Sequence, residues 1–303
     1  MATQSSSEDY LKEFLDQKDH ADNKPKVEES NKEEIKDLGS VKDLDFIGID
    51  ISELPCRDFY PAGTTVKVRP AKVSEIQAYS MVDDTNMYDV YEKVNHLVSS
   101  CVFLISPTGD KMPYTHLKDG DRWYLLFVIR ELTFQKGKDL YIEVDNVQIP
   151  IQRKNFEFYK MDDKLKKYYR KEEGKFIFTT QMGEVEMSPP TLGVQKSFTD
   201  YMVDQTKKRK VLNQSFLKII PFTLPNRLSI TQEGIEKKLK EFGEMDIEMF
   251  QFLNGAAEKM TFGIKGVKMI DNQSGQEVRS DEIFPKGFSG LFVQHDAFDT
   301  FLT

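Results

Sequence analysis

The chain has 303 residues, of which 39% are hydrophobic and 30% charged, and a formal net charge of −8. Its longest wholly apolar run, residues 125–129, is far shorter than a membrane span, which excludes a transmembrane protein. Residues 1–45 hold thirteen Asp/Glu and seven Lys, a net charge of −6, so only −8 − (−6) = −2 remains for residues 46–303. This nearly neutral remainder argues against a dedicated nucleic-acid surface, which needs a basic footprint.

Residues 1–45 are predicted to form a disordered acidic tail, because their polar side chains bury too little apolar surface to offset the entropy lost on ordering. One segment of this tail is apolar. Its residues at positions i, i+1, i+4 and i+5 share one face of a helical turn: Tyr10, Leu11, Phe14 and Leu15. The segment is either a peptide that folds on a partner or a transient solvated helix.

The stretch Leu54–Pro70 reads LPCRDFYPAGTTVKVRP, and its residue choices are the most particular in the chain. Pro55 and Pro61 push the residue before each of them toward an extended conformation. Gly63 permits a turn, and β-branched residues alternate with basic ones over the next six positions. We therefore expect a turn followed by a short strand over residues 64–69, with its valines on one face.

This pattern of LP, FYP, a glycine turn, V-x-VRP and a helix opening with Ser74-Glu75 resembles the T-even phage baseplate protein family of contractile-tailed viruses. The resemblance extends from about Leu54 to Thr133 and, more weakly, to about Tyr201. Ile129-Arg130 and the Pro-Thr-x-Gly turn at residues 190–193 also match the family pattern. No zinc site is carried over, because the chain lacks the Cys-x-x-Cys pairs of some members.

The resemblance implies a non-enzymatic tail protein, either a baseplate hub component or a hub assembly factor. Such a protein binds other baseplate or tail subunits. It is located in the host bacterial cytoplasm during assembly and, for a structural subunit, in the baseplate of the virion tail. An acidic tail favours an assembly factor, because disordered segments bind with low affinity per area and release readily.

The candidate partner-binding residues come from the two segments described above, with Leu54–Pro70 expected at the surface or edge of the fold. They are Leu54, Pro55, Phe59, Tyr60, Pro61, Arg69, Tyr10, Leu11, Phe14 and Leu15. The alternative for Phe59 and Tyr60 is packing of their rings in the core, since aromatic side chains bury large areas wherever they are enclosed.

Two helices and a buried helix are predicted next. Ser74 is expected to cap a helix that runs to Val82, and Asp83-Asp84 to cap a second one with a core-facing stripe from Met87 to Ile105. Residues 122–132 are apolar nearly all round and predict an enclosed helix. Arg130, near its end, is expected to act as an internal clamp rather than a substrate ligand.

Two hairpins follow, at residues 140–151 around Asp145-Asn146 and at residues 175–187. A helix is expected from Pro189 to about Leu212. The run Lys207–Lys210 is interpreted as cations at the C-terminus of this helix, and the alternative is a phosphate or nucleic-acid patch.

The last part of the chain predicts a boundary or buried extended crossing at residues 217–226 and two helices at residues 229–242 and 246–260. Closing strands are expected at residues 262–270 and 283–293. The predicted fold is α+β, with helices packed against short antiparallel hairpins. Its predicted divisions are the tail (1–45), a family-like domain (46–215) and a C-terminal extension or subdomain (216–303).

No motif for catalysis or cofactor binding is present: there is no nucleophile elbow, phosphate-binding loop or dinucleotide turn, and the four histidines are scattered. We expect no cofactor and no metal, and free buried thiols at Cys56 and Cys101. Two alternatives stay open. A tail-associated cell-wall hydrolase requires two converging carboxylates or a perturbed acid, and a nucleic-acid-binding accessory protein would use Lys207–Lys210.

Overall fold

The computed structural model describes residues 46–134, 140–180, 183–210, 213–224, 230–271 and 274–292. The fold is α+β, as the sequence predicts: helices pack against several small antiparallel sheets. The predicted tail, with its segment Tyr10–Leu15, lies outside the described residues.

The first sheet has four antiparallel strands in the order β1-β2-β3-β4. They are β1 (Ile47–Ile49), β2 (Thr65–Val68), β3 (Val102–Ile105) and β4 (Lys111–Met112). The strand predicted at residues 64–69 is confirmed as β2, and its Val66 and Val68 are fully buried. Leu54 and Tyr60 are extended, as expected from the prolines that follow them.

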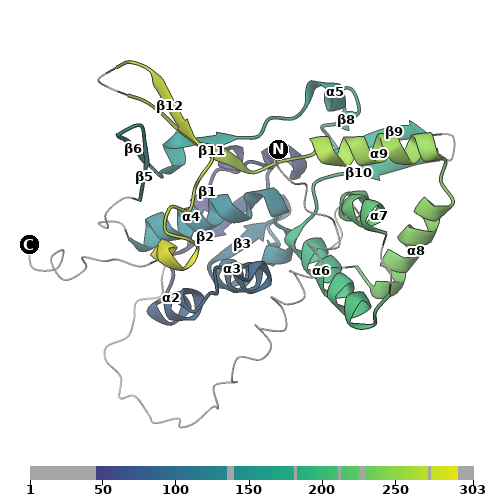
Figure 1. Cartoon of the computed structure of the whole chain (residues 1–303), viewed down its shortest axis with the longest axis horizontal. Helices are drawn as coiled ribbons and strands as arrows, with labels where there is room; N and C mark the ends of the chain where they lie inside the picture. The colour runs from purple at the N-terminus through teal and green to yellow at the C-terminus, as the bar shows by residue number, and fades with distance from the viewer. Residues whose placement is uncertain are drawn as a thin grey trace, which may run out of the picture.

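Three helices belong to the same half of the molecule (Figure 1): α2 (Val73–Ser80), α3 (Met87–Cys101) and α4 (Arg122–Thr133). The predicted start of α2 is wrong, because the Glu75 carboxylate accepts from the backbone N–H of Lys72 at 2.8 Å and the helix begins before Ser74. Eight of the twelve residues of α4 are buried, so α4 is the enclosed helix that residues 122–132 predict.

The predicted cap and end of α3 are also wrong. Asn86, not Asp83-Asp84, caps the helix by accepting from two backbone N–H groups. The Asp84 carboxylate instead accepts from the N–H and hydroxyl of Ser289. The helix ends at Cys101 because the β-branched and aromatic run that follows forms β3, so Ile105 lies on a strand.

Both predicted hairpins are confirmed. The first joins β5 (Tyr141–Val144) and β6 (Val147–Pro150), and both residues of its turn, Asp145 and Asn146, have positive φ angles, of 49° and 64°. This is the geometry of a type I′ turn. The second joins β9 (Lys175–Thr180) and β10 (Gly183–Met187). A third strand, β8 (Tyr169–Arg170), pairs with β9 after the short helix α5 (Asp163–Lys166).

The other half of the molecule is mainly helical (Figure 1) and contains α6 (Leu192–Lys207), α7 (Gln214–Ile219), α8 (Gln232–Gly243) and α9 (Ile247–Lys259). The helix α6 ends earlier than expected, and Lys208 at its C-cap forms an ion pair with Asp204 at 2.7 Å. The two predicted helices at residues 229–242 and 246–260 are confirmed as α8 and α9.

The extended crossing predicted at residues 217–226 is wrong, because the chain there forms α7 and a 3-10 turn at Ile220–Thr223. The Asn213 side chain starts α7 by accepting from two backbone N–H groups. Pro221 lies in the first turn of the 3-10 helix, where its missing N–H has no intrahelical partner to lose.

The third sheet has the order β12-β11-β7 and consists of β7 (Phe156–Phe158), β11 (Ile264–Ile270) and β12 (Glu277–Ser280). The strand predicted at residues 262–270 is confirmed as β11. The one at residues 283–293 is wrong, because two aromatic residues there, Phe284 and Phe288, pack against Trp123 and the described part of this segment ends in a 3-10 turn at Ser289–Phe292. The division at residue 216 stays a prediction, although β11 and β7 pair across it.

Two hydrophobic cores stabilise the fold. The first contains buried residues of β1–β3, α2–α4, the β5-β6 hairpin and β11, and the second contains those of β9, β10 and α6–α9. The stretch Leu54–Pro70 contributes to both, since Leu54, Val66 and Val68 lie in the first core and Cys56 and Phe59 in the second. This stretch therefore connects the two cores.

Candidate protein-binding groove

The structure separates the candidate residues of Leu54–Pro70 into buried and exposed ones. Leu54 is 1% exposed and Phe59 is 3% exposed, so the expectation that the whole stretch lies at the surface is wrong for these two. The Phe59 ring packs edge-on against those of Phe262 and Tyr169 at centroid distances of 4.8 and 5.6 Å. The alternative interpretation, packing in the core, describes Phe59 correctly.

Tyr60 takes part in a buried hydrogen-bond network between the two cores. Its hydroxyl donates to Asp121 Oδ2 at 2.6 Å and accepts from the backbone N–H of Lys118 at 2.8 Å. Asp121 Oδ1 accepts from the N–H of Cys56 at 2.8 Å, and Lys118 Nζ donates to the carbonyl of Pro189 at 3.2 Å. Each of these bonds joins segments more than fifty residues apart, so the network fixes how the cores meet.

Burial is the main cause of the pKa shifts of the titratable groups in this network. It raises the pKa of Asp121 to about 7, lowers the pKa of Lys118 to about 8 and raises the pKa of the Cys56 thiol. Asp121 is thus a perturbed acid of the kind that a hydrolase requires. It has no exposed surface, however, and a substrate would reach it only if the two cores separated.

Gly120 permits the close contact on which the network depends. A Cβ atom at this position would lie 2.7 Å from Cys56 Sγ and 3.0 Å from the carbonyl carbon and oxygen of Phe262. These distances are below van der Waals contact, so any larger residue would push the stretch around Cys56 away from α9 and β11. No sequence pattern signals this role, because a glycine between two acidic residues, here Asp119 and Asp121, is typical of a turn.

Arg69 is buried and holds β2 against α2. Its guanidinium forms a bidentate ion pair with Glu75 at 2.6 and 2.9 Å and donates to the carbonyl oxygens of Pro70 and Ser100. The predicted clamp Arg130 is also buried, and its Nε donates to the carbonyl of Leu291 at 2.8 Å. Both guanidinium groups therefore have internal partners.

Three candidates of this stretch have surface accessibility: Pro61 is exposed, and Pro55 and Tyr60 are half-buried. Pro55 lines a hollow of about 330 Å³, together with Arg57, Asp58 and the strand β7. Two residues from a much later part of the sequence, Phe262 and Lys268, also line this hollow. The Leu54–Pro70 stretch thus reaches the surface here.

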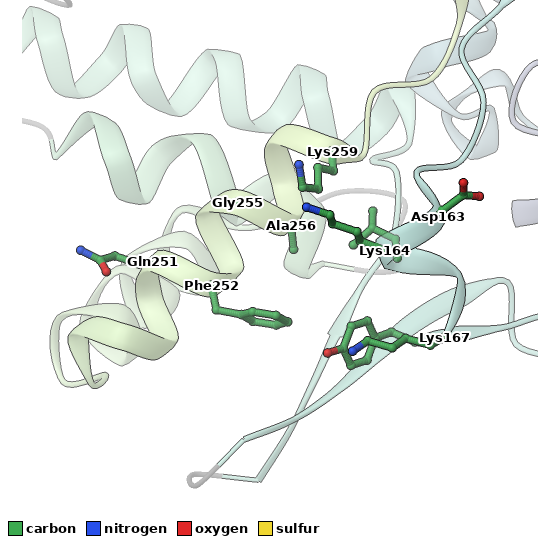
Figure 2. Close-up of a pocket in the computed structure, with 10 residues that line it drawn as sticks. Asp163, Lys164, Lys167, Gln251, Phe252, Gly255, Ala256 and Lys259 are labelled. Carbon is green, nitrogen blue, oxygen red and sulfur yellow. The ribbon is translucent and has the colours of Figure 1, made fainter.

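A larger groove, of about 550 Å³, lies between α5 and α9 (Figure 2). Its walls are near those of the first hollow in the sequence, because they begin two residues after Met161 and end three residues before Phe262. Its volume is within the range of protein pockets that hold a ligand. We call it the α5–α9 groove. Its lining residues are Asp163, Lys164, Leu165, Lys167, Tyr168, Gln251, Phe252, Gly255, Ala256 and Lys259.

Apolar side chains form the floor of the α5–α9 groove. Phe252 and Ala256 project from α9 into it (Figure 2). The Phe252 ring meets those of Phe178 and Tyr168 edge-on, at centroid distances of 5.2 and 5.9 Å. Phe178 is fully enclosed, whereas Phe252 is 40% exposed. The groove therefore presents an apolar surface on a rigid aromatic support.

Three lysines stand around this floor: Lys164 and Lys167 on the α5 side and Lys259 at the end of α9 (Figure 2). Lys167 Nζ lies 4.7 Å above the Tyr168 ring, and Lys259 Nζ is 3.9 Å from Asp162 Oδ2. The carboxylate of Asp163 forms an ion pair with Lys166, at a distance of 2.6 Å, rather than with one of these three lysines. An apolar floor with a cationic rim is suited to a segment that carries both apolar and acidic side chains.

Sequence reasoning missed the α5–α9 groove. Its two walls are about ninety residues apart in the sequence, and the local pattern of residues 164–173 indicates only a charged helix or connector. Phe252 carries no separate signal in the sequence, because it lies among other apolar residues of α9, such as Phe250 and Leu253, that are available for burial.

Within the described residues, no group of three or more His, Cys, Asp or Glu side chains could hold a metal ion. No helix in the same part of the chain is long and apolar enough to cross a bilayer. Cys56 and Cys101 are free, buried thiols, as expected. No protein-family model, curated protein or solved structure matches the chain.

Proposed function

We propose that the protein is a non-enzymatic binding protein of a phage tail, a baseplate hub component or hub assembly factor, and that the α5–α9 groove binds another tail subunit. The observation that carries the binding role is the exposed apolar floor of this groove within its ring of lysines. The phage context rests on the resemblance of the Leu54–Pro70 stretch.

The groove is built for binding rather than for chemistry. Its single lining carboxylate, Asp163, is paired with Lys166, and it contains no histidine, cysteine or serine. Its walls are held by the aromatic contacts of Phe252 and by the N-caps of α5 and α9, Asp162 and Asp246. A preformed, rigid site of this kind loses little entropy when a partner segment binds.

The hollow beside Pro55 is lined both by the stretch that carries the resemblance and by residues close in sequence to the walls of the groove, Met161 and Phe262. A partner that spans both hollows would contact Pro55 and the exposed residues Arg57 and Asp58 as well as the groove. The buried members of the stretch would support this surface from below through the two cores.

The first test is quantitative mass spectrometry of purified phage particles and of infected-cell lysate. A fixed ratio of this chain to known tail subunits in the particle identifies a structural hub component. Copurification with baseplate intermediates in the lysate, with absence from the particle, identifies an assembly factor. Absence of association with tail subunits in both fractions contradicts the proposal.

The second test places the Gly255→Met substitution in the phage. A Cβ atom at Gly255 meets nothing within 4 Å, so a methionine can be attached at this position of the groove wall and take up part of the groove. We expect fewer completed baseplates. The matched control is Gly243→Met, which also replaces a helical glycine with open space around it but lies at the end of α8, outside the groove.

A further inference from the structure

We propose that the α5–α9 groove is covered in the free protein by a segment of the same chain, the apolar stripe Tyr10, Leu11, Phe14 and Leu15. This inference rests on the proposed function, because it names the regulation of the same site: the segment occupies the groove until a partner displaces it.

The first argument is the match of apolar surfaces. The four apolar residues of the segment fall on one face of a helical turn, and they are the two aromatic and two leucine side chains of residues 8–16. The groove offers Phe252, Tyr168 and Ala256 over a volume of about 550 Å³. An amphipathic helical segment that lays its apolar face in such a groove is a recurrent mode of peptide recognition.

The second argument is the match of charge. Residues 8–16 carry four acidic side chains, Glu8, Asp9, Glu13 and Asp16, against the single Lys12, a net charge of −3. The rim of the groove carries three lysines, of which Lys259 is 3.9 Å from Asp162, and the one lining carboxylate, Asp163, is paired with Lys166. Opposite charges around an apolar contact select the orientation of the bound segment and exclude basic competitors.

The third argument is reach. Residues 16–45 place thirty residues between the segment and the first described residue, Phe46. A chain of that length spans at most about 100 Å, which exceeds the diameter of roughly 50 Å expected for a compact body of this size. The segment can therefore reach the groove of its own chain from any point at which the tail leaves the body.

Tethering makes even a weak contact effective. A linker of this length holds the segment at an effective concentration in the millimolar range, so a contact with a dissociation constant of about 100 μM as a free peptide is about 90% formed within the chain. An added ligand for the groove then binds about tenfold more weakly than to an open groove. The exposed aromatic floor is covered until a tail subunit with higher affinity arrives.

The test measures fluorescence anisotropy of a labelled peptide of residues 5–18 on the full-length chain. The peptide is expected to bind the double variant Tyr10→Ser/Phe14→Ser, whose own segment has lost its aromatic rings but kept its charge, about tenfold more tightly than the wild type. Binding to the double variant is expected to weaken when NaCl is raised from 50 to 500 mM, because lysines on the rim are screened.

Two further substitutions in the double variant locate the site. Gly255→Met is expected to abolish peptide binding, and the control Gly243→Met is expected to leave it unchanged. Removal of a glycine from a helix interior does not lower helix stability, so loss of binding by Gly255→Met would not reflect unfolding. Equal binding of the peptide to wild type and double variant, or binding that survives Gly255→Met, would overturn the inference.

Light scattering separates binding within one chain from binding between two. We expect the mass of a single 35.1 kDa chain for the wild type at all concentrations. A dimer that Gly255→Met dissociates would overturn the intramolecular form. The peptide assay contains no phage component, so its failure leaves association with tail subunits untouched, and absence of that association leaves the peptide result standing.

Discussion

The half-buried Tyr60 and the buried Tyr79 differ in what their hydroxyl groups contact. The hydroxyl of Tyr60 bonds to Asp121 and Lys118, whereas Tyr79 Oη is buried without a hydrogen-bond partner among the described residues. We expect Tyr60→Phe to lower the free energy of unfolding by about 1–3 kcal/mol, because it leaves buried polar partners unsatisfied. Urea denaturation followed by circular dichroism measures this change.

Tyr79→Phe is the matched control for that substitution. It removes a hydroxyl that gives up its hydrogen bonds to water on folding and forms none within the described residues. We therefore expect the free energy of unfolding to stay the same or to rise slightly. Equal destabilisation by the two substitutions would contradict the role assigned to the Tyr60 hydroxyl.

Asp121 makes stability depend on pH in the direction opposite to that of an ion-paired carboxylate. Its folded pKa of about 7 exceeds the ordinary value of 3.8, so its contribution to stability is complete at low pH and is lost as pH rises through this interval. Between pH 5 and pH 7, we expect the wild type to lose about 1–2 kcal/mol relative to Asp121→Asn. Urea denaturation at several pH values tests this.

The substitution Asp58→Asn is the control for the pH series, because Asp58 is an exposed residue of the same stretch. Its stability is expected to follow that of the wild type at every pH. A wild-type curve that runs parallel to that of Asp121→Asn would show that Asp121 is ionised in the folded protein.

At the scale of elements, the ion pair of Arg69 with Glu75 attaches the helix α2 to the strand β2. Hydrogen bonding to Arg69 lowers the pKa of Glu75 to about 2, so this contribution is present above about pH 4.5 and is lost as pH falls toward 2. We expect the wild type to lose about 1 kcal/mol relative to Glu75→Gln between pH 5 and pH 2.5. Unfolding curves in guanidinium chloride measure it, and an unchanged difference would contradict the assignment.

Elements with a local signal could be predicted from the sequence. The β5-β6 hairpin follows from Asp145-Asn146, which tolerate positive φ, and the strand β2 follows from alternation of valines with basic residues. The predictions of secondary structure are wrong where contacts between residues far apart in the sequence decide the local structure. The Ser289 contact removes Asp84 from its expected cap, and packing of Phe284 and Phe288 on Trp123 replaces the expected last strand.

The candidate site also divides into features with a local sequence signal and features that depend on distant contacts. Sequence reasoning selected the stretch Leu54–Pro70 because its residue choices are unusual, and the structure shows that much of this character serves the contact between two cores. The α5–α9 groove depends on α5 and α9 meeting in space, and no pattern within either segment encodes that meeting. Its lysines and Phe252 read as ordinary surface and core residues when they are taken separately.

For the whole molecule, the shared stretch predicts that the two cores unfold together. Phe59→Ala removes a ring from the second core only, and we expect a loss of about 3–5 kcal/mol. Fluorescence of Trp123, the only tryptophan, reports on the first core. Its urea midpoint should fall together with the protection of α9 amides from hydrogen exchange. A Trp123 midpoint that stays constant while α9 loses protection would show that the cores are independent.

Pairing of β7 with β11 also has a consequence for synthesis of the chain. Phe158 and Ile264, which are opposite each other in this pair, are separated by about 100 residues. At translation rates of about 5–20 residues per second, β7 waits roughly 5–20 seconds before the ribosome has made its partner. During that interval a nascent chain exposes the unpaired edge of β7 to other nascent chains, so synthesis includes a period in which this strand can pair with the wrong chain.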